Sequence, residues 1–462
     1  MLAPPQCSQT ISPELRLELH QEVHARPPEE LQAPLAITHW VMWINADERA
    51  ASRAHLLDLL AGRGLPEPDP QAVYHHADLG TFRLRWELHT EFVVWTFFQP
   101  LQPDEMSALA MAAGAELPVA GQRAPQAWSR DIPGAVLAGV NLWVLPREQV
   151  DADVLLARLF DPASLTGSRV SRGRADLHTD MRLRADGCSR FLLFTGGPGR
   201  EAVRPQRLGR LVQRVLEMET YRMTALLGLP AARQVVRWLA DAEAELAGLT
   251  HRLGQAQRAD EPELLDSLTR LAAQLEALYA RTHARFSASA AYHDLMRQRL
   301  QDLGEERVNG FQMLGDFLER RVAPAMATCR SADRRQAALS ARIARVSDLL
   351  RTRVEVHQQR SSRDLLANLN RRQGLQLKLQ STVEGLSVAA ITYYVVGLVG
   401  YLAEGASQWG WPVQRATAMA VAVPVVAVGT WWFLRRLHHR ISGSFGLDAA
   451  ADSVQPPADS GA

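Results

Sequence analysis

Two long uncharged apolar runs near the C-terminal end constrain the fold of this chain more than any other feature. Leu386–Leu402 and Ala416–Leu434 hold 17 and 19 residues without a charged side chain. A helix needs roughly 17–25 such residues to cross a bilayer. Two buried helices of a soluble core would give the same pattern, but paired runs of this length are rare in soluble domains. We predict a transmembrane hairpin at residues 381–440, with spans over about 384–403 and 414–435.

The charges that flank the two runs predict their orientation. Cations precede the first run and follow the second: Arg371, Arg372, Lys378, Arg435, Arg436 and Arg440. Such cations mark the cytoplasmic side, so we expect both termini in the cytoplasm. The first residues, Met1–Pro5, show neither the basic nor the apolar stretch of a secretory signal. We therefore expect a multi-pass protein of the bacterial inner membrane, with the lipid bilayer as its partner.

The composition excludes some classes of function. The 462 residues include 51 Lys and Arg and 50 Asp and Glu, a formal charge of +1. This balance argues against a nucleic-acid partner, which needs a basic surface. Three distant cysteines, Cys7, Cys188 and Cys329, provide neither a disulfide framework nor zinc-ligand spacing, as expected in a reducing compartment. No cofactor can be identified from these features.

The region before the apolar runs divides into two parts, and we predict an α+β fold. Residues 1–200 have the pattern of a mixed α/β domain, with expected strands at 35–44, 81–89, 92–98 and 136–145 and a helix at 47–60. A further strand at 170–183 is expected to form a hairpin with 191–195, turning at Asp186-Gly187. The alternation of strands and helices is too loose to fix the sheet order.

Residues 201–380 predict a long antiparallel coiled-coil stalk. Leu264, Leu268, Leu271, Leu275 and Leu278 follow each other in steps of four and three residues, which keeps one apolar face toward a partner helix. We expect a homo-oligomer formed through the stalk and the membrane helices.

The tail at 441–462 is rich in Gly, Ser, Ala, Asp and Pro, which is typical of disorder.

A possible metal or polar site involves His20, His24 and Arg26. On a helix, His20 and His24 would share one face and could reach the same ion. His89 and Glu91 would point to the same side of a predicted strand and could add ligands. A bare pair of histidines at this spacing is a weak signal, and partly buried histidines bonded to the backbone explain it more simply.

Two further polar motifs precede the stalk. Asp176, His178 and Asp180 alternate on a predicted strand, which we interpret as an exposed polar face rather than a catalytic row. The loop Thr195–Arg200 (TGGPGR) is rich in glycine and could cradle phosphate. It lacks the Walker lysine and the dinucleotide-binding spacing, so a flexible joint between domain and stalk is the preferred interpretation.

The first apolar run carries its own candidate residues. Tyr393 and Tyr394 lie near its middle, and two phenols in hydrocarbon need partners, either in helix packing or along a pore. Gly397 and Gly400 would permit close helix approach. Glu404 follows the run and could attract cations at an outer mouth.

The chain resembles a bacterial family of uncharacterised membrane-anchored proteins that share a domain of unknown function. Five motifs carry the resemblance: 22–27 (EVHARP), 86–92 (WELHTEF), 217–227 (EMETYRMTALL), 320–329 (RRVAPAMATC) and 382–394 (TVEGLSVAAITYY). The resemblance implies a cytoplasmic domain anchored by C-terminal helices and no known reaction.

In layout, the chain is also similar to the CorA-type magnesium channels. That family has a cytoplasmic α/β domain, a long stalk helix that enters the membrane and a short terminal hairpin, and its first membrane helix ends in the tripeptide Gly-Met-Asn. Here that helix ends with residues 400–405 (GYLAEG), so the tripeptide is absent, which argues against magnesium selectivity.

The sequence contains no strong catalytic motif and therefore favours a protein that is not an enzyme. We interpret it as an integral inner-membrane protein of unknown activity, a membrane-anchored cytoplasmic interaction or sensor module. A CorA-like divalent cation channel or transporter and a metal-dependent enzyme of the N-terminal domain are the alternatives.

Overall fold

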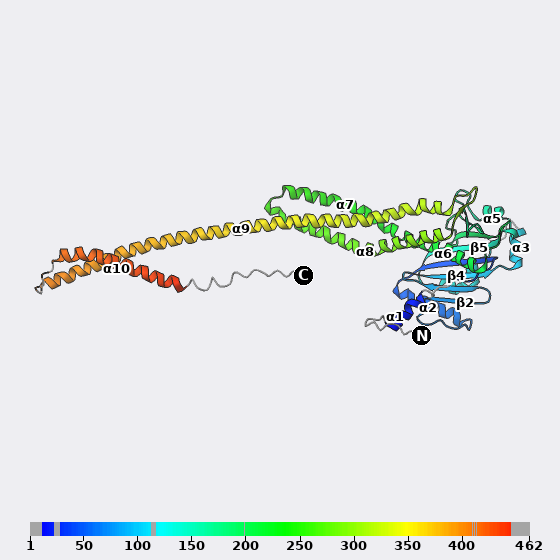
Figure 1. Ribbon diagram of the computed structural model, residues 1–462, viewed down its shortest axis with the longest axis horizontal. Coiled ribbons are helices and arrows are strands. Elements are labelled where there is room, and N and C mark those ends of the chain that lie inside the picture. Colours follow the sequence, from blue (N-terminus) through cyan, green and yellow to red (C-terminus); the bar gives the residue numbers. More distant parts are fainter. Residues whose placement is uncertain are drawn as a thin grey trace, which may run out of the picture. The chain divides into compact units, whose positions relative to one another are not determined.

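The computed structural model describes residues 12–22, 28–111, 117–197, 199–408, 410, 412 and 414–444. The chain divides into two compact units, Met1–Leu350 and Arg351–Ala462. Strands are concentrated in the first half of the chain and long helices follow, which confirms the α+β class (Figure 1).

Within the described residues, nine strands form one mixed sheet in the first unit. In spatial order they are β2 (Tyr74–Asp78), β3 (Arg83–Leu88), β4 (Phe92–Pro100), β1 (Leu35–Trp43), β5 (Ala135–Pro146), β8 (Ser189–Thr195), β7 (Ala175–Thr179), β6 (Thr166–Val170) and β9 (Glu306–Arg307). Neighbouring strands run antiparallel, except that β5 and β8 are parallel. The carboxyl ends of β5 and β8 therefore meet at one edge, where Pro146 lies opposite Thr195.

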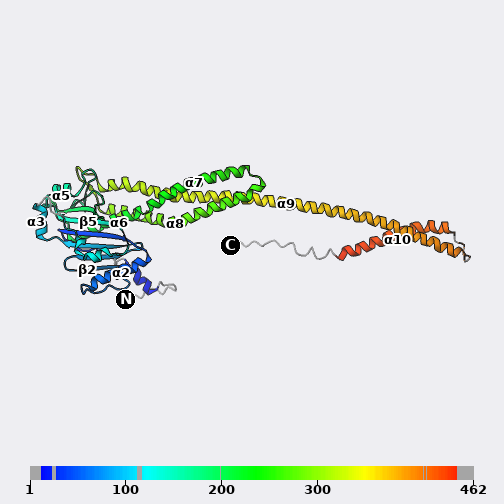
Figure 2. The same cartoon turned by 180° about the vertical axis from the view of Figure 1, so that it is seen from behind.

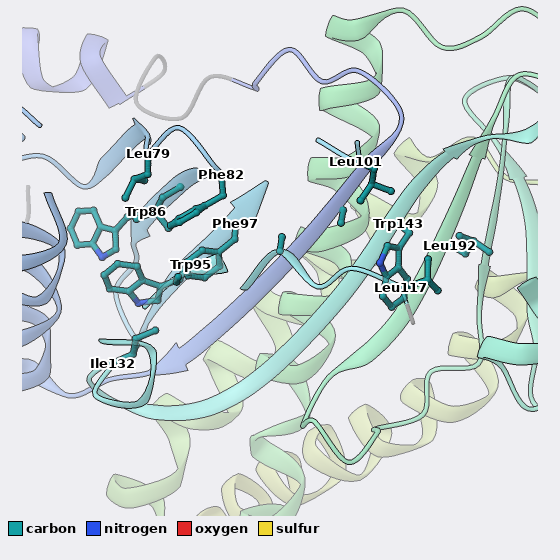
Figure 3. Packing of buried hydrophobic residues seen from close by; sticks show 14 of the residues in the cluster. Leu79, Phe82, Trp86, Trp95, Phe97, Leu101, Leu117, Ile132, Trp143 and Leu192 are labelled. Atoms are coloured by element: carbon teal, nitrogen blue, oxygen red, sulfur yellow. The ribbon is translucent and has the colours of Figure 1, made fainter. Parts of the chain in front are cut away.

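Both faces of the sheet are covered, because the central strands are apolar on both sides. One face packs against α2 (Ala46–Ala61) and α5 (Ala152–Leu159). Figure 3 shows Trp86, Trp95 and Trp143 in this layer, where they are at most 3 % exposed. On the other face, strand residues such as Phe92 pack against helices α6 (Pro205–Leu226) and α8 (Glu261–Asp302).

The remaining helices differ greatly in length. The short ones are α1 (Pro13–Glu22), α3 (Pro103–Met111), α4 (Gln126–Arg130) and the 3-10 turns η1 (Ala120–Arg123), η2 (Arg147–Gln149) and η3 (Arg258–Asp260). The long ones are α7 (Gly228–Gln255), α9 (Leu314–Gln408) and α10 (Arg415–Ser444).

The leucine stripes pack against helices of the same chain. Figures 1 and 2 show α7, α8 and the first part of α9 side by side. Leu239, Leu268 and Leu339 come from these three helices and are 0–1 % exposed. Arg335 of α9 also pairs with Glu243 of α7 at 2.9 Å. The leucine stripes before Leu350 thus pack against one another in a helical bundle of the same chain. Their buried side chains are therefore not available for contacts between copies.

One predicted strand is wrong in its extent. The sequence predicted a single strand over 170–183, but β6 ends at Val170 and β7 begins at Ala175. Ser171, Arg172 and Gly173 adopt positive φ angles of 56°, 58° and 81°, which turn the chain between the two strands. The expected turn before β8 is present, with Gly187 at a φ of 75°.

Candidate functional site

Three of the five residues of the predicted metal or polar site lie within the described residues, and they come from two separate segments of the chain. His20 lies on α1 with an exposed side chain, and His24 and Arg26 lie outside the described residues. His89 and Glu91 lie in the turn between β3 and β4, so the expectation that they share a strand face is wrong. In the part of the chain that the structure describes, no group of three His, Cys, Asp or Glu side chains could hold a metal ion.

His89 and Glu91 have protein partners instead. The ring of His89 stacks on Phe92, with 4.4 Å between the centroids. The carboxylate of Glu91 accepts two hydrogen bonds from Arg285 of α8, at 2.7 and 2.8 Å. Both bonds come from the same guanidinium nitrogen, Nη2, and this ion pair ties the β3–β4 turn to the helical layer. The metal hypothesis that includes His24 stays a prediction.

The polar row on β7 is buried, which corrects the interpretation of an exposed strand face. Asp176, His178 and Asp180 are 8 %, 4 % and 1 % exposed. Burial lowers the pKa of His178 to about 4, so this imidazole is neutral at physiological pH. Its ring packs edge-on against Phe194 and Phe311. These contacts indicate that His178 has a structural role in the sheet.

A cavity of about 590 Å³ lies at the carboxyl ends of β5 and β8. Its lining combines three segments: Leu31–Ala33 before β1, Pro146–Gln149 after β5, and Thr195–Leu208 from the end of β8 into α6, with several residues of each segment contributing. In sheets with parallel strands, ligands commonly bind outside these carboxyl ends. The volume is within the range of natural small-molecule pockets, roughly 300–1,000 Å³.

The glycine-rich loop forms one wall of this cavity. Gly196 and Gly197 line it, are buried and have φ angles of 73° and 128°. A Cβ at Gly197 would lie 3.0 Å from the Arg200 guanidinium, so glycine leaves room for this arginine. The described residues of the loop thus form a wall of the cavity, and the interpretation as a flexible joint stays a prediction.

Arg200 is fixed in place by Asp176. Two of its nitrogens bond the two carboxylate oxygens at 3.0 and 2.7 Å, and it also donates to the Gly173 carbonyl. Burial acts to raise the pKa of Asp176, but hydrogen bonds from Arg200 and Arg169 outweigh it and hold that pKa below its usual value. Two arginines thus share one carboxylate, and this pairing holds Arg200 at the cavity wall.

The sequence did not identify this cavity as a site. The glycine loop was visible, but Thr195 and Arg204 gave no separate signal. Their position depends on the parallel pairing of β5 with β8. In this pairing Val140 lies opposite Ser189, a residue 49 positions later in the chain. A loop that joins a buried strand to a long helix was the one available clue.

In the second unit, the end of α9 and α10 form an antiparallel hairpin. Gly400 packs against Met419, and a Cβ at Gly400 would lie 2.9 Å from the sulfur atom. The carboxylate of Glu404 accepts a hydrogen bond from Arg415 at 2.8 Å. Glu404 is therefore paired within the hairpin.

Other candidate residues of the hairpin face outward. Tyr393 and Tyr394 are 78 % and 74 % exposed, and their rings meet edge to face at 5.8 Å. A Cβ at Gly397 would meet no atom within 4 Å. These three residues do not contribute to the contact between α9 and α10.

Two helices of the described chain are long and apolar enough to cross a membrane by length and composition: the C-terminal part of α9, up to Ser407, and Arg415–Phe433 of α10. In their most apolar stretches, 17 % and 0 % of the residues are buried. Soluble core helices are mostly buried, and these helices are not.

Comparison with known proteins identifies the family but no activity. Residues 12–441 match the family described as "Protein of unknown function (DUF3422)". No curated protein and no solved structure gives a significant match. The match extends over the sheet, the helical bundle and both apolar helices, so the chain belongs to the DUF3422 family.

Proposed function

We propose that this protein is a cytoplasmic interaction or sensor module that a C-terminal hairpin anchors in the bacterial inner membrane. The observation that carries the proposal is the exposed apolar surface of the end of α9 and of α10. Leu386 and Leu398 of α9 are 75 % and 62 % exposed, and Val421 and Val425 of α10 are 66 % and 65 % exposed.

Comparison with the bundle supports this assignment. Leu339 and Leu350 lie earlier on the same helix α9 and are 1 % and 0 % exposed. Exposed apolar area costs about 25 cal/mol per Å² in water, and soluble monomers rarely leave large patches uncovered. A bilayer would cover the outer faces of both helices, and the helical backbone would satisfy its own hydrogen bonds there.

The flanking charges support an orientation with both termini in the cytoplasm. Arg436 stacks on the ring of Trp432, 4.9 Å from its centroid, near the end of the second apolar run. An aromatic ring beside a cation is typical of the membrane interface. In this arrangement, residues 1–200 and the stalk at 201–380 lie in the cytoplasm, 381–440 form the hairpin, and the tail at 441–462 returns to the cytoplasm.

Membrane fractionation of two truncated chains tests the anchor. A chain that ends at Ser444 keeps both helices, and we expect it in the membrane pellet after extraction with alkaline carbonate. A chain that ends at Gly385 lacks them and is expected in the soluble fraction. The proposal fails if the longer chain is extracted by carbonate or if the shorter chain stays in the pellet.

We also propose that copies associate through the part of α9 beyond Leu350. Leu365, Leu366 and Leu369 are 64 %, 59 % and 48 % exposed there, in contrast to the buried stripes of the bundle. Light scattering of the detergent-solubilised chain, with the detergent mass subtracted, measures the number of copies. A strictly monomeric mass would exclude this association.

A CorA-like channel is the alternative for the same layout. It would need several hairpins around a pore, and the pairing of Glu404 with Arg415 leaves that carboxylate less available to cations. Magnesium uptake into liposomes that contain the protein, above that of empty liposomes, would favour the channel over the anchor.

A further inference from the structure

We propose that the cavity at the ends of β5 and β8 binds a small organic anion through a phosphate or carboxylate group. Neither the family match nor the membrane anchor assigns this site. Three observations support the proposal: an unpaired hydroxyl in the lining, an arginine that no described carboxylate engages, and the start of α6 beside the cavity.

Thr195 provides the most specific observation. Eight threonines are buried among the described residues: Thr38, Thr96, Thr166, Thr179, Thr195, Thr220, Thr224 and Thr282. The hydroxyls of seven are hydrogen-bonded to other groups of the protein. Thr195 is 4 % exposed and lines the cavity, and its hydroxyl forms no hydrogen bond within the described residues. The hydroxyl is not one of the fully enclosed unpaired side-chain atoms, so it is open to the cavity, where a bound molecule could become its hydrogen-bond partner.

The arginines of the lining indicate that this partner is negatively charged. Arg200 and Arg204 line the cavity, and Arg147 lies beside it, held 4.8 Å from the ring centroid of Phe194. One acidic residue, Glu148, also belongs to the lining and is exposed. Arg200 is already paired with Asp176, so Arg204, which no carboxylate of the described residues engages, is the lining arginine free to bind an anion. Arginine donates paired hydrogen bonds to carboxylate and phosphate groups.

The start of α6 also borders the cavity, through Arg204, Pro205 and Leu208. Arg204 is the N-cap of this 22-residue helix, and no side chain caps its first turn by a hydrogen bond. Pro205 has no N–H and the Leu208 N–H donates to the Arg204 carbonyl, so it is the positive end of the helix dipole that favours a bound anion here. Gly196 lines the adjacent wall without a side chain, whereas the space beside Gly197 holds the Arg200 guanidinium.

Calorimetric titration of the full-length protein in an uncharged detergent tests the proposal. Pyrophosphate and citrate serve as the phosphate and carboxylate probes, and sucrose as the neutral one. We expect saturable binding of one molecule per chain for at least one anion and none for sucrose. Preference for pyrophosphate or for citrate identifies the recognised group.

Three variants localise the binding. Thr195→Val removes the hydroxyl at nearly constant volume, and the loss of one charge-assisted hydrogen bond predicts at least about a fivefold weaker affinity. Arg204→Gln changes an exposed side chain that the fold does not need, and it is expected to weaken binding by a similar factor. Thr269→Val changes an exposed threonine of α8 and should leave the affinity unaltered. Absence of anion binding, or equal affinity in all variants, would overturn the proposal.

Discussion

Gly400 of α9 lies directly against Met419 of α10, so closely that a Cβ at Gly400 would stand 2.9 Å from the Met419 sulfur. Val396 and Ala403, about one helical turn to either side, are 6 % and 7 % exposed, while most apolar residues around them face outward. Small residues allow two membrane helices to approach and pack. Gly400 is therefore the closest point of the hairpin contact.

Replacement of this glycine should open the hairpin. Gly400→Leu is expected to push the two helices apart, whereas Gly397→Leu should not, because a Cβ at Gly397 meets no atom within 4 Å. A short bismaleimide cross-linker between Glu404→Cys and Arg415→Cys, in a chain without the native cysteines, reports the distance. We predict efficient cross-linking in the Gly397 variant and little in the Gly400 variant. Equal yields would show that the contact is unimportant.

Gly209 of α6 is another position where a side chain does not fit. A Cβ there would lie 1.6 Å from the carbonyl oxygen of Glu29, in the segment that precedes β1. We predict that Gly209→Ala lowers the free energy of unfolding by about 3 kcal/mol or more, since the backbone must move. Gly248→Ala, on an exposed face of α7 with open space around it, should instead raise stability by up to about 1 kcal/mol. Denaturant melts of both full-length variants measure the difference.

The pair of Glu91 and Arg285 predicts a coupling energy between the sheet and α8. Their side chains are 30 % and 17 % exposed, so the pair is only partly screened by water. Arg285→Met leaves the Glu91 carboxylate without its two hydrogen bonds, and we expect a loss of about 1–3 kcal/mol. The further change Glu91→Gln should recover part of that loss. A double variant no more stable than Arg285→Met alone would contradict the pairing energy.

Acid should destabilise the first unit through His39. This imidazole of β1 is 3 % exposed, and it lies 2.9 Å from the hydroxyls of both Thr96 and Thr220. Burial, helped by Arg85, lowers its pKa to about 3. Below the unfolded pKa of about 6.5 the unfolded chain binds a proton that the folded chain excludes, so stability falls as the pH drops from there toward 3. The loss approaches about 1.4 kcal/mol for each pH unit.

His39→Gln checks this assignment, because it removes the titrating group. The variant should show a flatter fall of unfolding free energy between pH 6 and 4.5 than the parent chain, whatever its stability at neutral pH. Burial also lowers the pKa of His178 to about 4. This second imidazole therefore lowers the unfolding free energy in acid as well, and the His39→Gln variant keeps that contribution. Parallel curves for parent and variant would exclude His39 as a source of the acid sensitivity.

The strands that the sequence predicted well are those with dense β-branched and aromatic residues. β4 (FVVWTFFQP) was expected at 92–98 and extends over Phe92–Pro100. Eight of its nine residues are buried, because both faces of this strand are covered, and its sequence is therefore almost continuously apolar. The break between β6 and β7 was missed because two of its three positive-φ residues, Ser171 and Arg172, are types that rarely adopt that conformation.

Long-range pairing explains what the sequence could not provide. The burial of Asp176 and His178 depends on neighbouring strands and on Phe311, which comes from the segment between α8 and α9. The cavity likewise needs β5 beside β8 and the segment before β1 beside α6, where the Leu31 amide donates to the Pro205 carbonyl. Local patterns of period two or 3.6 contain no information on such partners.

The most direct test of the membrane hairpin is labelling of single cysteines with a membrane-impermeant maleimide in spheroplasts. Ser407→Cys, near the connector, and Ser362→Cys, on α9 before the apolar stretch, replace exposed serines in a chain without the native cysteines. The hairpin predicts that the cysteine at 407 reacts in intact spheroplasts and that the cysteine at 362 reacts only after the membrane is permeabilised. Protection of both positions until permeabilisation would contradict a hairpin that crosses the membrane twice.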